Sequence, residues 1–226
     1  MSTPTAIVTG AATGLGEAIA RDLGRANCLV VCAARDGETG ESVAADIREA
    51  GGEAVAVRTD VRDEFDLERT CETAAREGQG GIDAVVPAAA VDHAGSSQVP
   101  LGGDSYAAFD DQFRTNARGV YATVRESIPH LVEEARVVVP VHGTDDPGAG
   151  GTYAVSRAST VALVRGFAKE LPGPVGGLDP GHPVPAFERQ ADLDPAEAAA
   201  SVRWALLAAP AEDIDGRVLR EEAWRS

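Results

Sequence analysis

Short runs of apolar residues alternate with longer segments of helical periodicity along most of the chain. The apolar runs do not alternate apolar with polar residues, which is typical of strands that are buried on both faces. Strands are predicted at residues 5–9, 28–33, 54–59, 82–88, 136–141, 175–178 and 217–220. Helices are predicted between them at residues 15–26, 38–50, 64–77, 106–134, 153–171 and 195–208.

This alternation predicts a doubly wound α/β fold. Parallel strands need crossover connections, and right-handed crossovers place helices on both faces of the sheet. Gly- and Pro-rich stretches at residues 147–151 and 171–185 are expected to be functional loops, because the alternation continues beyond them. The prediction is one Rossmann-type domain over residues 1–226, with a parallel seven-stranded sheet and helices on both faces.

The composition narrows the class of protein but does not indicate which reaction or ligand it serves. The 226 residues are 44% hydrophobic and 25% charged, which favours a globular chain. No apolar run reaches the roughly 20 residues that span a bilayer, and residues 1–10 lack the features of a secretory signal. Cys28, Cys32 and Cys71 do not form a metal-ligand cluster, so we expect buried thiols in a reducing cytoplasm and no metal site.

The chain is strongly acidic. Thirty-six acidic residues against 20 basic ones give a net charge of −16, and Lys169 is the one lysine. Because such a surface repels nucleic acids and anionic lipids, neither is an expected partner. A halophilic cytoplasm favours acid excess with few lysines, and a GC-rich genome also replaces lysine with arginine, so both explanations stay open.

A glycine-rich turn follows the first predicted strand. Residues 9–16 read TGAATGLG, with glycine at positions 10, 14 and 16. Glycines at such a turn let the backbone approach a pyrophosphate, which the free N–H groups at the start of the helix can hold. Any strand–helix turn can contain glycine, but this one lies at the first junction of an alternating chain and favours a dinucleotide site.

The spacing of these glycines resembles the TGxxxGxG motif of the short-chain dehydrogenase/reductase family. Further matches follow in the order of the family's classical branch: Asp60-Val61, Asn116 in TNARG, Tyr153 in YAVSR, Pro180-Gly181, and DGRV at residues 215–218. The resemblance implies that Asp60 accepts a hydrogen bond from the adenine amino group. An N-cap of the following helix is the other interpretation of Asp60.

The resemblance also implies a cofactor. An acidic residue at the end of the second strand would bind the ribose 2′-hydroxyl of NAD(H), but Ala34 stands there, followed by Arg35. The guanidinium can bind a 2′-phosphate, so NADP(H) is expected over NAD(H). Arg35 could instead pair with Asp36. The residues expected to hold the cofactor are Gly10, Thr13, Gly14, Leu15, Gly16, Arg35, Asp60, Val61, Ala88, Ala89, Tyr153, Arg157, Pro180 and Gly181.

The family's chemistry needs a tyrosine whose pKa is lowered by a lysine four residues later. Here Tyr153 is followed by Arg157, which lies on the same helical face. A cation about 4 Å from a phenol at an effective dielectric near 20 stabilises the phenolate by about 4 kcal/mol, roughly three pKa units. Arginine can therefore supply the charge, although its planar fork differs in shape from an ammonium group. Asn116 matches the asparagine of the family's proton relay.

Other positions depart from the family pattern. His142 stands where the catalytic serine is expected, Thr144 is the alternative, and His142 could equally be a loop residue that bonds to Asp145 or Asp146. The fourth strand ends PAAA at residues 87–90 where the family has NNAG, and HPVP follows the PG turn at residues 182–185. These departures gather at the part of the expected site that would hold the nicotinamide and the substrate.

Two functions follow from this pattern. The first is an NADP(H)-dependent oxidoreductase that interconverts a carbonyl and a secondary alcohol of a small molecule, with Tyr153, Arg157, Asn116 and His142 as its catalytic set. The second is a non-catalytic NADP(H)-binding sensor or assembly subunit that keeps the fold. The resemblance further implies a homodimer or homotetramer, formed through the helices predicted at residues 106–134 and 153–171.

Overall fold

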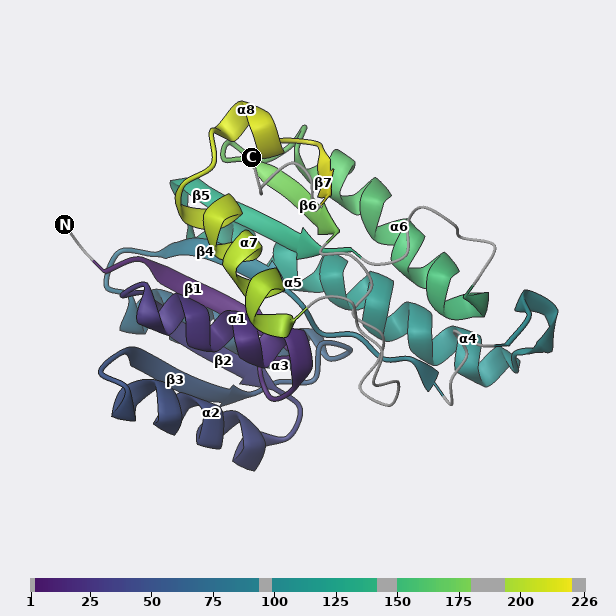
Figure 1. The fold of residues 1–226 in the computed structure, drawn as a ribbon, viewed down its shortest axis with the longest axis horizontal. Helices are drawn as coiled ribbons and strands as arrows, with labels where there is room; N and C mark the ends of the chain where they lie inside the picture. Colours follow the sequence, from purple (N-terminus) through teal and green to yellow (C-terminus); the bar gives the residue numbers. More distant parts are fainter. Residues whose placement is uncertain (1–2, 94–98, 142–149, 180–193, 221–226) are drawn as a thin grey trace.

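The computed structural model describes residues 3–93, 99–141, 150–179 and 194–220. Its centre is a sheet of seven strands in the order β3-β2-β1-β4-β5-β6-β7, with every neighbouring pair parallel (Figure 1). The strands are β1 (Thr5–Thr9), β2 (Leu29–Ala34), β3 (Glu53–Arg58), β4 (Ile82–Pro87), β5 (Leu131–Pro140), β6 (Val175–Asp179) and β7 (Val218–Arg220). The predicted seven-stranded parallel sheet is thus confirmed.

Helices cover both faces of this sheet. They are α1 (Gly14–Arg25), α2 (Gly37–Glu49), α3 (Glu64–Glu77), α4 (Tyr106–Gln112), α5 (Gly119–Ser127), α6 (Gly151–Phe167), α7 (Pro195–Leu207) and α8 (Ala211–Ile214). Side chains alternate along each strand, so Ala6 and Val8 of β1 join a core with α1, α2 and α7. Ile7, between them, joins a second core with α3, α5 and α6 on the opposite face.

The helix predicted at residues 106–134 is wrong in extent. After α4 the chain makes a π-helical turn, Phe113–Arg118, before α5 continues to Ser127. A short 3₁₀ turn, Ile128–His130, then ends the helix, because Pro129 cannot donate a backbone hydrogen bond. Residues 131–134 belong instead to β5, which is longer than predicted. Pairing of two copies through this segment stays a prediction.

No helix in the described part of the chain combines the length and the apolar character that crossing a membrane requires.

The core between α1 and α7 offers a test of the packing. Leu23 of α1 is fully buried in it, whereas Leu207 at the end of α7 is 41% exposed. Leu23→Ala is expected to lower the free energy of unfolding by about 2–5 kcal/mol, because it removes buried methyl groups and leaves a cavity. Leu207→Ala is the matched control and should change it by less than about 0.5 kcal/mol. Chemical denaturation measures both, and equal losses would contradict the packing described.

Candidate functional site

The turn between β1 and α1 is packed closely at two of its glycines. Gly10 has a φ of +71°, and a Cβ there would lie 2.8 Å from the Cα of Ala89. A Cβ on Gly16 would lie 2.2 Å from the carbonyl oxygen of Gly10. Gly14 has a φ of +58°, which favours glycine for conformational reasons. The three glycines therefore let the first turn of α1 sit directly against the end of β1.

The start of α1 keeps its backbone donors available. Thr13 is the N-cap of this helix, and within the described residues its side chain makes no capping hydrogen bond. The first N–H groups of α1 consequently point out of the turn at the positive end of the helix dipole, next to exposed Thr13 and half-buried Leu15. This arrangement suits an anion such as a pyrophosphate.

The end of β2 presents a cation beside this turn. Strand β2 ends at Ala34, and the exposed Arg35 comes next. Asp36 is the N-cap of α2, because its Oδ1 accepts from the N–H groups of Glu38 (3.0 Å) and Thr39 (3.3 Å). Among the described residues Arg35 forms no salt bridge, so the predicted alternative of a pair with Asp36 is absent there.

Asp60 follows β3 at the same edge of the sheet. The N-cap of α3 is Asp63 and not Asp60, so the capping interpretation of Asp60 is wrong. The Asp60 carboxylate accepts instead from the Arg62 guanidinium, with Nη2 2.7 Å from Oδ2. Hydrogen bonds from Arg62 hold the pKa of Asp60 below its usual range, and Arg35 adds to this effect. Asp60 is therefore an anion at the rim of a hollow of about 470 Å³.

Val61 and the two alanines after β4 complete the base of this region. Val61 is buried with Leu67 of α3 and Ala122 of α5, and Ala89 packs against that cluster. The N–H of Ala89 donates to the side-chain oxygen of Thr9 at 3.3 Å, which ties the end of β4 to the end of β1. Ala88 and Ala89 thus form the small-residue floor between the glycine turn and the segment that follows β4.

Asn116 joins three segments. It lies in the π-helical turn, fully buried, and its Oδ1 accepts from the N–H of Val91 at 2.7 Å. Its Nδ2 donates to the carbonyl of Val91 at 2.9 Å and to Oγ of Ser156 at 2.9 Å. π-Helical turns are frequent at functional sites, and this one aims Asn116 at α6. Asn116 therefore couples the segment after β4 to the helix that carries Tyr153.

A second contact repeats this pattern one helical turn earlier. The Nε2 of buried Gln112 donates to Oγ1 of Thr152 at 2.6 Å, and Asp104 accepts from both the N–H and the hydroxyl of Thr152. Gln112 and Asn116 are four residues apart on one helix, as are Thr152 and Ser156 on α6. Of these four residues, only Asn116 was indicated by the sequence, and for a proton relay rather than for this contact, although the shared spacing of four was visible.

Tyr153 and Arg157 lie within the first two turns of α6. Arg157 is fully buried and its Nη2 donates to the carbonyl of Pro140, the last residue of β5. Its Nε and Nη1 have no partner among the described residues. Burial lowers the pKa of Arg157, while Tyr153 and then Asp179 of β6 oppose that change, and an arginine remains charged at neutral pH.

The phenol of half-buried Tyr153 experiences opposing influences. Burial is the main effect and raises the pKa of Tyr153 above its usual value of 10.0. The Arg157 charge lowers this pKa, and the Asp92 carboxylate raises it. Asp92 was not among the predicted site residues, because its nearness to Tyr153 depends on how the segment after β4 is placed.

Four predicted positions lie outside the described residues: His142, its alternative Thr144, Pro180 and Gly181. Their expected roles stay predictions.

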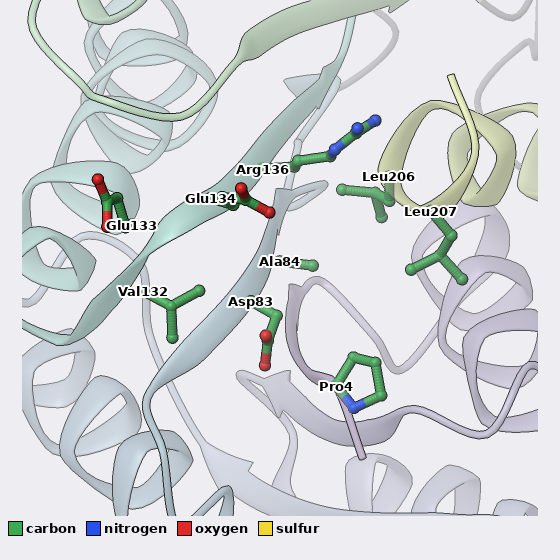
Figure 2. Close-up of a pocket in the computed structure, with 9 residues that line it drawn as sticks. All are labelled: Pro4, Asp83, Ala84, Val132, Glu133, Glu134, Arg136, Leu206 and Leu207. Atoms are coloured by element: carbon green, nitrogen blue, oxygen red, sulfur yellow. The ribbon is translucent and has the colours of Figure 1, made fainter. Parts of the chain in front are cut away.

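A separate hollow of about 430 Å³ lies at the opposite, amino edge of the sheet (Figure 2). Two of its polar groups serve the fold: Asp83 accepts from the N–H of Thr5 at 2.8 Å, and Arg136 donates to the carbonyls of Ala205 and Ala209 at the end of α7. Ligands of open α/β sheets bind at the carboxyl ends of the strands, where the glycine turn, Asn116 and Tyr153 are found.

A family model described as short chain dehydrogenase matches residues 4–181. The chain belongs to the short-chain dehydrogenase/reductase family. Among curated family members, the short chain dehydrogenase/reductase AacuN of Aspergillus aculeatus is 33% identical over 169 residues, which are 73% of this chain and 62% of that protein. The 4-formylbenzenesulfonate dehydrogenase TsaC1/TsaC2 of Comamonas testosteroni is 33% identical over 170 residues, 74% of this chain and 66% of that protein.

Solved structures of short-chain dehydrogenases superpose on nearly the whole chain. A dehydrogenase/reductase from Sinorhizobium meliloti 1021 has a TM-score of 0.84 and 26% identity, covering 97% of this chain and 94% of that one. A short chain dehydrogenase from Burkholderia cenocepacia J2315, solved with NADP, has a TM-score of 0.83 and 26% identity, covering 96% and 95%. The matched region spans slightly less than two thirds of these two curated relatives, whereas it spans most of the solved chains.

The glycine turn generates a prediction about stability. Gly16→Ala is expected to lower the free energy of unfolding by about 1–3 kcal/mol, because the new Cβ must displace the Gly10 carbonyl. Gly166→Ala in α6 is the control, since a Cβ there meets nothing within 4 Å. It should leave stability unchanged or raise it by up to about 1 kcal/mol, as alanine favours helix over glycine. Unfolding in denaturant measures both, and a neutral Gly16→Ala would contradict the close approach.

Proposed function

We propose that this short-chain dehydrogenase/reductase is an NADP(H)-dependent oxidoreductase that interconverts a carbonyl and a secondary alcohol. The observation that carries the proposal is the pairing on α6 of the half-buried Tyr153 with the fully buried Arg157, one turn apart, at the carboxyl edge of the sheet. A phenol next to a buried cation is suited to exchange a proton with a substrate oxygen.

The residues around the glycine turn fit a dinucleotide. The close backbone approach at Gly10 and Gly16 shapes the turn, and the start of α1 offers its N–H groups to a pyrophosphate. Asp60 is an anion, bonded to Arg62, and we expect it to accept from the adenine amino group. The exposed Arg35 supports NADP(H) over NAD(H), because its fork suits a phosphate. Among the solved relatives, one from Burkholderia cenocepacia is in complex with NADP and one from Brucella melitensis with NADH.

The chain's own residues would supply the proton chemistry. When bound, the nicotinamide supplies or accepts the hydride. Tyr153 donates a proton to the carbonyl oxygen in the reducing direction and takes it back in the other. Arg157 stabilises the phenolate that is left, and its Nε and Nη1 have no hydrogen-bond partner among the described residues. Asn116 fixes α6 against the segment after β4, and His142 or Thr144 would meet the substrate oxygen.

A second function is favoured by one observation. Arg157 stands where the family has lysine, and one arm of its guanidinium is already engaged by the Pro140 carbonyl. That engagement favours a non-catalytic NADP(H)-binding sensor or assembly subunit. Both functions require cofactor binding, so turnover separates them. Loss of NADPH absorbance with a panel of aldehydes, ketones and quinones, at low and molar salt, supports the enzyme, and no oxidation with any of them supports the sensor.

Tyr153→Phe is expected to lower kcat by about 10²–10⁴-fold, because the ring remains but the proton donor is lost. Affinity for NADPH should stay within about twofold, measured by calorimetry. Tyr121→Phe is the matched control, since Tyr121 is 44% exposed and stacks on Phe167 away from the glycine turn. Activity retained by Tyr153→Phe would remove Tyr153 from the mechanism.

Arg157→Lys is expected to keep or raise kcat, because an ammonium group retains the charge that lowers the pKa of Tyr153. Arg157→Leu should lower kcat at neutral pH by at least about tenfold, since the phenolate loses its cation. Steady-state rates of the two variants, with circular dichroism as a check on folding, make the comparison. A complete loss in Arg157→Lys would show that the planar fork is required in its own right.

A further inference from the structure

The Asp60 carboxylate is held from one side by a single residue. The Arg62 guanidinium donates to both of its oxygens, from Nε to Oδ1 at 2.9 Å and from Nη2 to Oδ2 at 2.7 Å. The backbone N–H of Arg62 also donates to Oδ1, at 3.0 Å. Two parallel bonds from a planar fork fix the plane of a carboxylate as well as its place. Asp60 therefore cannot turn without breaking its contacts with Arg62.

This arrangement leaves one acceptor position of Asp60 open within the described part of the chain. A carboxylate offers about four lone-pair sites. Oδ1 accepts two donors from Arg62, whereas Oδ2 accepts Nη2 and only a longer share of Nε, at 3.2 Å. The Asp60 side chain is 23% exposed and lines the hollow of about 470 Å³, so a ligand can reach it. A ligand N–H fits the open position, and a ligand oxygen is repelled there.

Arg62 is itself held in place. Its Nη1 donates to Oδ1 of Asp111 on α4 at 2.8 Å, and its carbonyl accepts from the guanidinium of Arg118 at 2.7 Å. The other oxygen of Asp111 lies 3.2 Å from Nε2 of His93, in the segment after β4. Pairs of this exposure stabilise little one by one, but a network of side chains holds its members more firmly than single pairs do. The fork on Asp60 is thus fixed by contacts from other segments.

We propose that Arg62 is a positioning residue, whose fork makes the cofactor site select a 6-aminopurine over a 6-oxopurine. The proposal rests on the proposed NADP(H) binding and on the expected contact of Asp60 with the adenine amino group. An amino N–H fills the open position on Oδ2. A 6-oxo group places an acceptor there instead, and the ring N–H beside it is out of reach, because the carboxylate is prevented from turning toward it.

The test is calorimetry of the protein with NADPH and with reduced nicotinamide hypoxanthine dinucleotide phosphate, which differ in the base alone. The wild-type protein is expected to bind NADPH about tenfold to a hundredfold more tightly, the usual range for a hydrogen bond to a charged group. Arg62→Gln should bring the two affinities to within about threefold, because a carboxylate free to turn accepts from either base and from water. Equal affinities in the wild-type protein, or an unchanged ratio in Arg62→Gln, overturn the proposal.

Two further variants separate the orientation of the carboxylate from charge alone. Arg76→Gln removes the same charge from the last turn of α3, where Arg76 is exposed and pairs with Glu77, and it should leave the ratio of affinities unchanged. Arg62→Lys keeps a positive charge beside Asp60 but cannot bond both carboxylate oxygens in parallel, so the ratio should fall as in Arg62→Gln. A wild-type ratio in Arg62→Lys, or an equal fall in Arg76→Gln, overturns the role of the fork. Circular dichroism checks that each variant is folded.

Failure of the oxidoreductase proposal is distinguishable from failure of this one. Binding of NADPH without turnover of any carbonyl removes the enzyme and leaves the preference for the base measurable. If NADPH is not bound, the cofactor proposal fails, and titration with adenosine and inosine 5′-monophosphates tests Arg62 directly. A preference for the adenosine nucleotide that is lost in Arg62→Gln supports the role of Arg62, whereas equal or absent binding of the two nucleotides overturns it.

Discussion

The hydrogen bonding of β1 to both β2 and β4 fixes where the rest of the molecule lies. The chain proceeds from β1 outward in one direction to β3 and then returns to the other side of β1 to form β4 and the strands beyond it. The segments leaving β1 and β4 must therefore separate at their carboxyl ends, and a ligand can enter between them. The contact of Ala89 with Thr9 and Gly10 shows how tightly the two ends approach before they part.

Burial of the Arg157 guanidinium carries a desolvation cost for the fold. A guanidinium without solvent is costly unless nearby groups offset its charge. Here the Pro140 carbonyl accepts one hydrogen bond, and Asp179 supplies an opposite charge from the next strand. Two donor nitrogens stay unmatched among the described residues. An energetic cost of this kind, here a buried charge with unmatched donors, is typical of functional sites, where a destabilising group is kept for its chemistry.

Much of the fold could be predicted from the sequence, because each central strand is a continuous apolar run and each junction is marked by glycine, proline or a capping residue. The predicted extent of the helix at residues 106–134 was wrong. Residues 131–134 have a composition that favours a helix, but in the structure they form the first part of strand β5. The glycine turn was predicted from the spacing of its glycines and from its position at the first strand–helix junction. The contacts of Gln112 and the nearness of Asp92 to Tyr153 were not, because they depend on how segments about 40 or more residues apart align in space. The catalytic and cofactor roles stay predictions.

The paired contacts between the turn of Gln112 and Asn116 and the turn of Thr152 and Ser156 have a mechanical meaning. On each helix the two contacting residues are four positions apart. A rotation of α6 about its axis, or a shift along it, would therefore break both hydrogen bonds at once. Any movement that accompanies a working cycle must then leave α6 in place. The helix itself would act as a stationary reference for the phenol and the guanidinium that it carries.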